Sequence, residues 1–496
     1  MKRRTAYIVL AIIFAIVLSS RLYFALQTAD FSYDAYDELR QIEHIKETGK
    51  PIYQDDLSFS GRTNVFAPFF YYLIAFFSFF MPVVLAAKII PNILAACTVF
   101  IVYLVTHELT KKHLASLISA LFSGFLLVFF TRTLNTISPY TLVIPLIFLI
   151  TYCILKIKKP AYLYLTLVLM LILVLSHITA FLLIFALVFF FLIARLENFE
   201  LLKERIELLL FITFLTFWFN FIIYKNAFLV HGAKVIWQNT PILILSSYFT
   251  EITFLQVIYA IGVIPLILGV YAIYYNFFEQ KQKPTYLFMG FAIAVFLLLW
   301  FKLIPLDVGL IFLGVVLTIL AGVGLEIMIG YFNKTRFSKV APYIISILLV
   351  LFIITSVFPL INAATMEMRD KPRYAEKQAL EWLGNHTEND SIILGTMKEG
   401  HVINYFAGRK NVIDSNFLMV PLADQRYADV NRIFTTPYKP DSVRLLNQYG
   451  ITHIYFSPTA RQTYNISKVY YIHDEECFLL LYNETVQIYL SRCRID

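Results

Sequence analysis

The chain has 496 residues, 59% of them hydrophobic and only 15% charged, and its formal net charge is +8. Soluble proteins carry about one charged residue in four, so this composition excludes an ordinary soluble protein and favours one that crosses a membrane many times. The positive charge does not indicate nucleic-acid binding, because the basic residues gather in short connections between apolar segments, as the positive-inside rule describes.

Long apolar segments predict about eleven membrane-spanning helices. They cover approximately residues 6–25, 84–108, 114–131, 140–156, 160–178, 179–194, 206–224, 254–276, 284–302, 306–331 and 340–362. Segment 66–81 is also apolar, but counting it as a span would put the basic connections at 111–112 and 156–159 outside. Leaving it out places every basic connection on one side. We therefore expect 66–81 to lie at the outer surface or to re-enter without crossing, and we expect a cytoplasmic N-terminus with a retained first helix.

Directly after the first apolar segment comes the acidic stretch 32–40. Asp34, Asp37 and Glu38 stand at i, i+3 and i+4, which is one face of a helical turn. They can form an acidic cluster where the chain leaves the membrane, or Asp34 can simply cap the helix with Asp37 as its capping-box partner. Arg40 could orient Asp37, bind a phosphate through two hydrogen bonds, or form an ordinary i, i+3 ion pair.

A second long outer segment, 225–253, has its own charged side chains. Its candidates are Lys225, His231, Lys234 and Glu251. Because long loops of compact proteins usually carry function, the three basic residues could bind a phosphate; a basic loop beside lipid headgroups would have the same composition. Glu251 is either a metal ligand brought in from afar or a solvated acid at a helix start.

Beyond residue 362 the composition becomes that of a soluble domain. We expect a transmembrane domain at 1–362, with a long first outer loop at 28–82, and an extracytoplasmic α/β domain at 363–496. Periodicity and turn residues predict helices at 374–383, 399–407 and 442–449, strands at 391–395, 411–414 and 451–457, and short strands at the end. Cys477 and Cys493 could form a disulfide if this domain faces an oxidising compartment.

Three pieces of the sequence, all on the predicted outer side, point to one family. Residues 34–40 fit the pattern D-x-(W/Y)-x-x-x-R after a first span, 131–140 stand where a second outer motif is expected, and 392–414 look like the start of an external domain. In this order they resemble the catalytic subunits of oligosaccharyltransferases and the wider C-type (GT-C) membrane glycosyltransferases, which use lipid-phosphate sugar donors.

The chain differs from the oligosaccharyltransferases in three places. The late-span arginine that these enzymes offer to the donor phosphate is not evident, and Lys302 is the only cation near Asp307. Residues 134–140 contain no acid where that family carries D-x-D or D-x-E, and Thr396-Met397-Lys398-Glu399-Gly400 stands in place of its W-W-D-Y-G pattern. The resemblance therefore favours transfer of a monosaccharide to another lipid, glycan or protein acceptor over transfer of a whole oligosaccharide to asparagine.

The resemblance implies a polytopic α-helical membrane protein with a GT-C-like fold and a C-terminal extracytoplasmic α/β domain, in the cytoplasmic membrane. It implies transfer of a sugar from a polyprenyl (dolichyl or undecaprenyl) phosphate donor to an acceptor at the outer face. Asp34 is then the candidate base or metal ligand, with Asp37 and Glu38 as second choices. Mg²⁺ or Mn²⁺ is the expected cofactor, with Asp34 and Glu251 as candidate ligands. The candidate substrate-binding residues are Arg40, Lys225, His231, Lys234, Glu399 and His401; Glu399 could equally begin a helix.

Two other classes of function stay open. A transporter of lipid-linked glycans would usually show duplicated halves and ionisable residues at mid-bilayer, and we find no duplication and few such residues. A non-catalytic relative that binds a glycan or scaffolds a complex fits the second outer motif without its acids.

Overall fold

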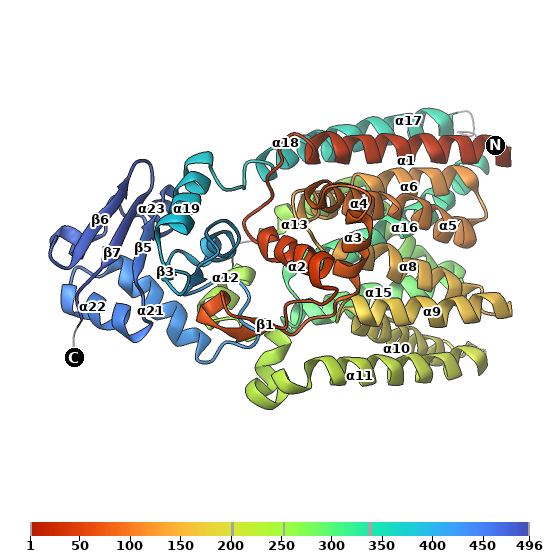
Figure 1. Cartoon of the computed structure of the whole chain (residues 1–496). Coiled ribbons are helices and arrows are strands. Elements are labelled where there is room, and N and C mark those ends of the chain that lie inside the picture. Colours follow the sequence, from red (N-terminus) through yellow and green to blue (C-terminus); the bar gives the residue numbers. More distant parts are fainter. Residues whose placement is uncertain (1, 200–202, 251–252, 336–339, 495–496) are drawn as a thin grey trace. The chain divides into compact units, whose positions relative to one another are not determined.

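A computed structural model describes residues 2–199, 203–250, 253–335 and 340–494 (Figure 1). These residues belong to two compact units. We call Met1–Thr28, Ala67–Ile223 and Tyr248–Arg369 the helical unit, and Ala29–Phe66, Tyr224–Ser247 and Asp370–Asp496 the mixed unit. The acidic stretch thus belongs to the mixed unit, together with most of the second long outer segment. The predicted domain boundary at 362/363 stays a prediction.

Each predicted span coincides with apolar helix in the helical unit. The helices are α1 (Arg3–Ala25), α3 (Phe69–Ser78), α4 (Val83–Ala96), α5 (Thr98–Thr110), α6 (His113–Gly124), α7 (Leu127–Arg132), α8 (Tyr140–Leu155), α9 (Pro160–Ser176), α10 (Ala180–Leu196), α11 (Lys203–His231, which enters the mixed unit at Tyr224), α13 (Phe254–Ile261), α14 (Val263–Tyr275) with the π-helix η3 (Asn276–Gln280), α15 (Lys283–Trp300), α16 (Leu306–Asn333), and α17 (Ala341–Phe352), which continues through the π-helix η5 (Ile353–Val357) into α18 (Phe358–Glu367).

Helix α16 is the centre of the helical unit, because 94% of its most apolar 18 residues are buried. It packs closely on α14 at two glycines: a Cβ on Gly269 would lie 2.9 Å from the carbonyl oxygen of Leu317, and one on Gly324 would lie 2.3 Å from that of Leu268. Helices α13 and α14 meet at a bend of 90°. Gly262 forms this bend with a φ of +96°, a backbone conformation that favours glycine.

The number of spans is smaller than the sequence predicts when length is the criterion. Among the described residues, six helices are long and apolar enough to cross a membrane, or seven if the bent pair counts as one span. The prediction of eleven is not confirmed, because several apolar helices are short: α9, with 17 residues, extends only about 26 Å against a hydrocarbon core of about 30 Å. Helix α3, with 10 residues, covers about 15 Å, which agrees with the prediction that segment 66–81 does not cross.

The mixed unit contains, among its described residues, a five-stranded sheet with the strand order β4-β3-β5-β7-β6. Strand β3 (Ile392–Leu394) pairs in parallel with β4 (Lys410–Asn411) and with β5 (His453–Phe456). Strand β7 (Gln487–Ser491) pairs antiparallel with β5 and with β6 (Phe478–Asn483). Strands are present within the predicted segments 391–395 and 451–457. The strand predicted at 411–414 is instead the two-residue β4, which shares only Asn411 with the prediction.

The helices and loops of the mixed unit come from all three of its chain segments. The first segment has α2 (Ala35–Thr48), the strand pair β1 (Gln54–Asp55) and β2 (Arg62–Thr63), and η1 (Ser58–Ser60) between them; the second has η2 (Gly232–Trp237) and α12 (Ile242–Thr250), which leaves the unit after Ser247. The third has α19 (Tyr374–His386), η6 (Met397–Glu399), α20 (Gly400–Val402), the π-helix η7 (Ile403–Ala407), α21 (Ala423–Thr435), α22 (Lys439–Gln448), α23 (Pro458–Tyr464) and η8 (Tyr470–His473). Helices α21 and α23 were not predicted.

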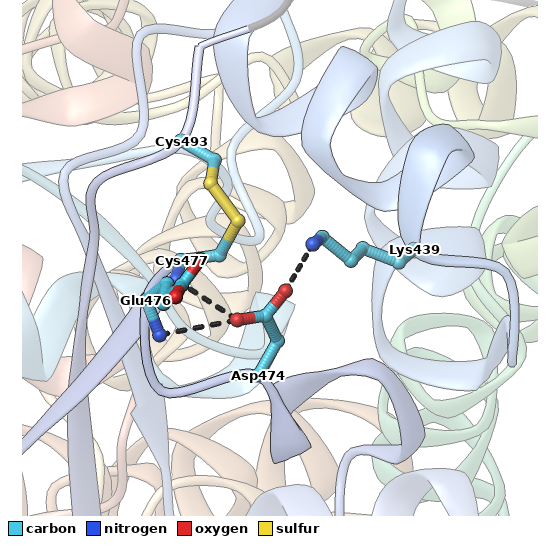
Figure 2. Close-up of a disulfide and its surroundings, with 5 residues drawn as sticks. All are labelled: Lys439, Asp474, Glu476, Cys477 and Cys493. Atoms are coloured by element: carbon cyan, nitrogen blue, oxygen red, sulfur yellow. Dashed lines mark hydrogen bonds and ion pairs between the residues drawn. A yellow bond between two sulfur atoms is a disulfide. The ribbon is translucent and has the colours of Figure 1, made fainter.

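Cys477 and Cys493 form a disulfide, with their Cα atoms 4.8 Å apart (Figure 2). The bond ties the turn before β6 to the residues after β7. Beside it, Asp474 accepts hydrogen bonds from the backbone N–H groups of Glu476 and Cys477 and pairs with the ammonium group of Lys439. A disulfide here fits a domain that folds in an oxidising compartment.

Candidate functional site

Asp34 precedes helix α2 and does not act as its cap. Its backbone is already in the right-handed helical region, and its side chain makes no capping hydrogen bond to the described residues. Instead its Oδ1 accepts a hydrogen bond of 2.8 Å from the hydroxyl group of Ser415, in the loop after β4. The capping interpretation of Asp34 is therefore wrong, and the carboxylate is exposed.

Arg40 is bound by carboxylates of its own unit. Its Nη2 lies 3.4 Å from Asp37 Oδ1, and both of its Nη atoms bind the buried carboxylate of Asp55, with Nη1 at 3.0 Å. Burial alone would lower the pKa of Arg40, but the two carboxylates outweigh it and raise that pKa. The bidentate geometry that was predicted for a phosphate is made with Asp55, and a role of Arg40 in phosphate binding stays a prediction. Glu38, on the same turn, is half-buried.

Asp414 is fully buried and surrounded by donors. The Ser58 hydroxyl donates to it, the Asn411 side-chain amide and the Asn416 backbone N–H donate over 3.1 and 2.9 Å, and the Arg62 guanidinium lies 3.7 Å away. Burial alone would raise the pKa of this carboxyl, but Arg62, His401 and the hydrogen bonds lower it to about 2. Asp414 is therefore an ionised group that ties the first chain segment of the mixed unit to the third.

His401 lies between two of these acids. Its Nδ1 is 3.8 Å from Asp37 Oδ1, and its Nε2 is 3.6 Å from Asp414 Oδ1 and 3.1 Å from the Ser415 hydroxyl oxygen. The preceding Gly400 lets the chain come this close, because a Cβ there would lie 2.1 Å from the carbonyl oxygen of Ile413. The structure thus brings the predicted residues Asp34, Asp37 and His401 to one place in the mixed unit.

Aromatic contacts fasten η7, the continuation of the His401 segment, to α2. The ring of Tyr36 lies 5.0 Å from that of Tyr405 and 5.1 Å from that of Phe406, between centroids. The Tyr405 hydroxyl donates a hydrogen bond of 2.9 Å to Glu43. Burial raises the pKa of Glu43 above its usual value. These contacts explain why α2 and the His401 segment meet although more than 350 residues separate them in the chain.

Glu399, predicted to bind substrate, is buried and occupied inside the fold. Its Oε2 accepts hydrogen bonds from the backbone N–H and hydroxyl of Thr396, at 3.1 and 2.8 Å, and its Oε1 accepts one from the Ser457 hydroxyl. Burial raises the pKa of Glu399 to about 7. The residue completes the capping box of η6, so the alternative interpretation, that it begins a helix, agrees with the structure.

The basic residues of the second outer segment are not joined to the acids of α2 by any contact among the described residues. Lys225 and Lys234 are exposed, and His231 is half-buried. Lys234 Nζ lies 3.2 Å from Asp424, whose Oδ1 also accepts a hydrogen bond from the backbone N–H of Ile242. That hydrogen bond, outweighing partial burial, and Lys234 lower the pKa of Asp424. Glu251 lies outside the described residues.

A buried polar cluster in the helical unit was missed by the sequence analysis. Arg21 of α1, only 1% exposed, donates to Asn92 Oδ1 at 3.0 Å and to the hydroxyl of Thr133 at 2.5 Å. Lys88, one turn before Asn92 on α4, is also buried, and its Nζ lies 3.5 Å from Asn135 Oδ1. Ionisable residues within membrane helices are costly and usually functional, and this signal could have identified both cations.

The described residues contain no group of three or more His, Cys, Asp or Glu side chains placed to hold a metal ion. Asp34 is bonded to Ser415, and Asp37 lies beside Arg40 and His401. These side chains alone do not fit a divalent cation, and the predicted pairing of Asp34 with Glu251 stays a prediction. What the described acids can do by themselves is accept protons.

No known protein family matches the chain, and neither does any curated protein. Solved structures do match. The oligosaccharyltransferase of Archaeoglobus fulgidus in its apo form has a TM-score of 0.72 at 14% identity, covering 92% of this chain and 70% of its own. ArnT from Cupriavidus metallidurans, bound to undecaprenyl phosphate, has a TM-score of 0.55 at 13% identity over 97% of each chain. The mycobacterial arabinofuranosyltransferase AftD has 0.62 at 14% identity over 100% of this chain and 40% of its own.

These similar proteins are all GT-C glycosyltransferases. At such identities the similarity shows the fold alone. The chain therefore has the GT-C fold, as the resemblance of its motifs predicts, and the apolar helices together with these membrane enzymes support a multi-pass membrane protein.

Proposed function

We propose that the chain is a membrane glycosyltransferase that transfers a sugar from a polyprenyl phosphate donor to an acceptor at the outer face of the cytoplasmic membrane. The fold supports a transferase, and similar structures contain the proposed kind of lipid: AglB from Archaeoglobus fulgidus with a dolichol-phosphate, and ArnT with undecaprenyl phosphate. The observation that carries the proposal is Asp34, an exposed carboxylate directly after the first apolar helix that is not used to cap α2.

The proposed reaction is a displacement at the anomeric carbon of the donor sugar. The acceptor oxygen or nitrogen forms a bond to this carbon while the bond to the phosphate oxygen breaks, and the electron pair leaves with the polyprenyl phosphate. The proton of the acceptor passes to Asp34, which acts as general base. Asp37 and Glu38 are the second choices for this role.

Cationic groups must meet the charge that grows on the departing phosphate. Lys225 and Lys234 are exposed and His231 is half-buried, and we propose them, with Arg40, as donor ligands. A divalent cation at Asp34 and Glu251 belongs to the same proposal, and the enzyme from Archaeoglobus fulgidus has been solved in complex with Zn and sulfate. His401 and Glu399 are proposed on the acceptor side, although the burial of Glu399 favours a structural role.

The test is the substitution Asp34→Asn in the full chain. Purified protein in detergent micelles is given radiolabelled polyprenyl-phosphate-linked hexose, pentose and N-acetylhexosamine donors, with a membrane extract as acceptor or with water alone. We expect wild type to release or transfer one of these sugars and Asp34→Asn to lose at least about 100-fold in rate, as expected when a general base is removed. Asp56→Asn, an exposed acid of the same loop, is the matched control and should retain wild-type activity.

The same assay separates the alternatives. If wild type turns over no donor, or if Asp34→Asn is as active as Asp56→Asn, the proposed mechanism is wrong. Binding of the lipid-linked donors without turnover would instead favour the non-catalytic glycan-binding protein, and movement of the donors across sealed vesicles would favour the transporter.

A further inference from the structure

The carboxylate of Asp34 is held by one side chain. Ser415 donates its hydroxyl proton to Asp34 Oδ1 over 2.8 Å, and no other hydrogen bond or ion pair reaches this carboxylate from the described part of the chain. Oδ2 of this exposed side chain thus has no hydrogen-bond partner among the described residues. Asp34 and Ser415 belong to the same compact unit although 381 positions separate them.

The Asp34 carboxylate determines which atoms carry protons at Ser415 and His401. A serine hydroxyl has one proton to donate, and here that proton goes to Asp34. The contact of 3.1 Å between Ser415 Oγ and His401 Nε2 must then be donated by the imidazole, which places a proton on Nε2. His401 Nδ1 is buried and makes no hydrogen bond to the described residues, although Asp37 Oδ1 lies 3.8 Å from it.

The imidazole is itself fixed in place. His401 is only 3% exposed, its Nε2 lies 3.6 Å from the buried Asp414, and Gly400 allows its backbone to approach Ile413 and Asp414. The buried imidazole of His401 thus donates to the exposed Ser415, and Ser415 donates to the exposed carboxylate of Asp34. This order is the one needed to hold a base in a single orientation.

We propose that Ser415 is a positioning residue for Asp34. By holding Oδ1 it keeps Oδ2 directed at the acceptor. His401 donates to the Ser415 oxygen, so the single hydroxyl proton of Ser415 is left to donate to Asp34. Ser415 takes no proton from the acceptor and touches no substrate. The inference rests on the proposed function, because it assigns the residue that orients its general base.

The test compares Ser415→Ala and Ser415→Thr, using the donor that wild type hydrolyses in the micelle assay. Loss of a hydrogen bond to a charged group should lower kcat by about 10- to 100-fold in Ser415→Ala. The KM for the donor should stay within about 3-fold of wild type, because binding is not affected. Ser415→Thr keeps the hydroxyl and should restore kcat to within about 3-fold. Ser467→Ala, an exposed serine of the same unit, is the matched control.

Each outcome supports or overturns the inference. Equal kcat in Ser415→Ala and Ser467→Ala overturns it, and if Asp34→Asn is inactive in the same assay, the proposed function still stands. A raised KM with unchanged kcat also overturns it, because Ser415 would then bind substrate directly. Failure of Ser415→Thr to restore kcat contradicts a role for the hydroxyl. Melting temperatures of the purified variants show whether a loss of activity is a loss of folding, which is not expected at an exposed serine.

Discussion

Two buried carboxyl groups of the mixed unit illustrate how different surroundings shift the pKa of a carboxyl group in opposite directions. Asp414 and Glu399 are 0% and 2% exposed, and each accepts hydrogen bonds from a serine hydroxyl and from backbone or side-chain donors. Within the described part of the chain, Asp414 forms an ion pair with a guanidinium, that of Arg62, and Glu399 forms none. Its pKa is lowered to about 2, whereas burial and the neighbouring Glu376 raise the pKa of Glu399 to about 7.

The difference shows that burial and hydrogen bonds alone do not decide whether a carboxyl group is ionised. The region of Asp414 holds a fixed negative charge, which keeps His401 and the loop of Ser415 in place beside Asp34. The region of Glu399 is a helix cap whose carboxyl group is only about half ionised near pH 7. The fixed negative charge next to the proposed base Asp34 is therefore that of Asp414.

The largest expected effect is that of Arg62→Met, which removes the cation of the Asp414 region. Both side chains are at most 2% exposed, so a buried charge would lose its partner. Such a loss typically costs about 3–5 kcal/mol of unfolding free energy, which chemical denaturation of the detergent-solubilised protein would measure. Adding Asp414→Asn should recover part of the loss, because no uncompensated charge then remains.

Arg432→Met is the control for this experiment. Arg432 also pairs with an aspartate, Asp441, but its side chain is 53% exposed. Exposed ion pairs contribute about 0–1 kcal/mol, so this variant should unfold close to wild type. A loss of equal size in Arg62→Met and Arg432→Met would show that the Asp414 region is not organised around its cation.

The second effect is a pH dependence from Glu399. Because burial raises its pKa from 4.5 to about 7, the folded protein binds the proton more tightly than the unfolded chain does. Its contribution to stability is therefore full below pH 4.5 and is lost as the pH rises through about 7. The loss amounts to at most about 3 to 4 kcal/mol, because each tenfold difference in proton affinity corresponds to about 1.4 kcal/mol.

Glu399→Gln keeps a neutral side chain at every pH and should flatten this part of the stability profile. The measurement is the unfolding free energy at several pH values between 5 and 8, given relative to wild type. Glu381→Gln, on the exposed face of α19, is the matched control and should leave the profile as it is in wild type. If Glu399→Gln follows the wild-type curve, Glu399 is ionised in the folded protein and the contrast with Asp414 is absent.

Much of the fold could be predicted from local patterns. Apolar runs located the described helices that lie within the helical unit, since a membrane helix pairs its own backbone groups by hydrogen bonds and needs only apolar side chains towards the lipid. The lengths of the helices were not predicted correctly, because short helices such as α6 and α9 are as apolar as the long ones. Helices α21 and α23 were missed because their sequences are polar, with few apolar residues to show a period.

The candidate site was predictable only in part, because it depends on contacts between distant segments. The acids at Asp34 and Asp37 and the imidazole of His401 carry chemical types that can be recognised in sequence. Ser415 cannot be recognised in the sequence, because one serine in a polar loop resembles any other. Only the fold brings it 2.8 Å from Asp34. Glu399 was selected for its chemistry, but its capping role depends on Thr396 and Ser457.

The smallest expected effect compares two glycines, Gly400 and Gly395, one beside each carboxyl group. A Cβ on Gly400 would lie 2.1 Å from the Ile413 carbonyl oxygen and 2.6 Å from Asp414 Cβ. Unlike a side chain, the backbone of Ile413 cannot relieve this clash by changing its rotamer. Gly400 has an ordinary helical φ of −53°, so space rather than backbone freedom requires the glycine. Gly400→Ala should cost about 1–3 kcal/mol, as overpacked positions do, and should lower the transfer rate by displacing His401.

A Cβ on Gly395 would meet only the terminal Cδ1 atom of Ile403, at 2.5 Å, because Glu399 Cβ is 3.7 Å away. A terminal methyl group can move to another rotamer, so Gly395→Ala should cost less than Gly400→Ala and leave the transfer rate unchanged. Denaturation and the micelle assay on the two variants measure both differences. If Gly395→Ala lowered the transfer rate as much as Gly400→Ala does, the Glu399 region would be as closely coupled to Asp34 as the Asp414 region.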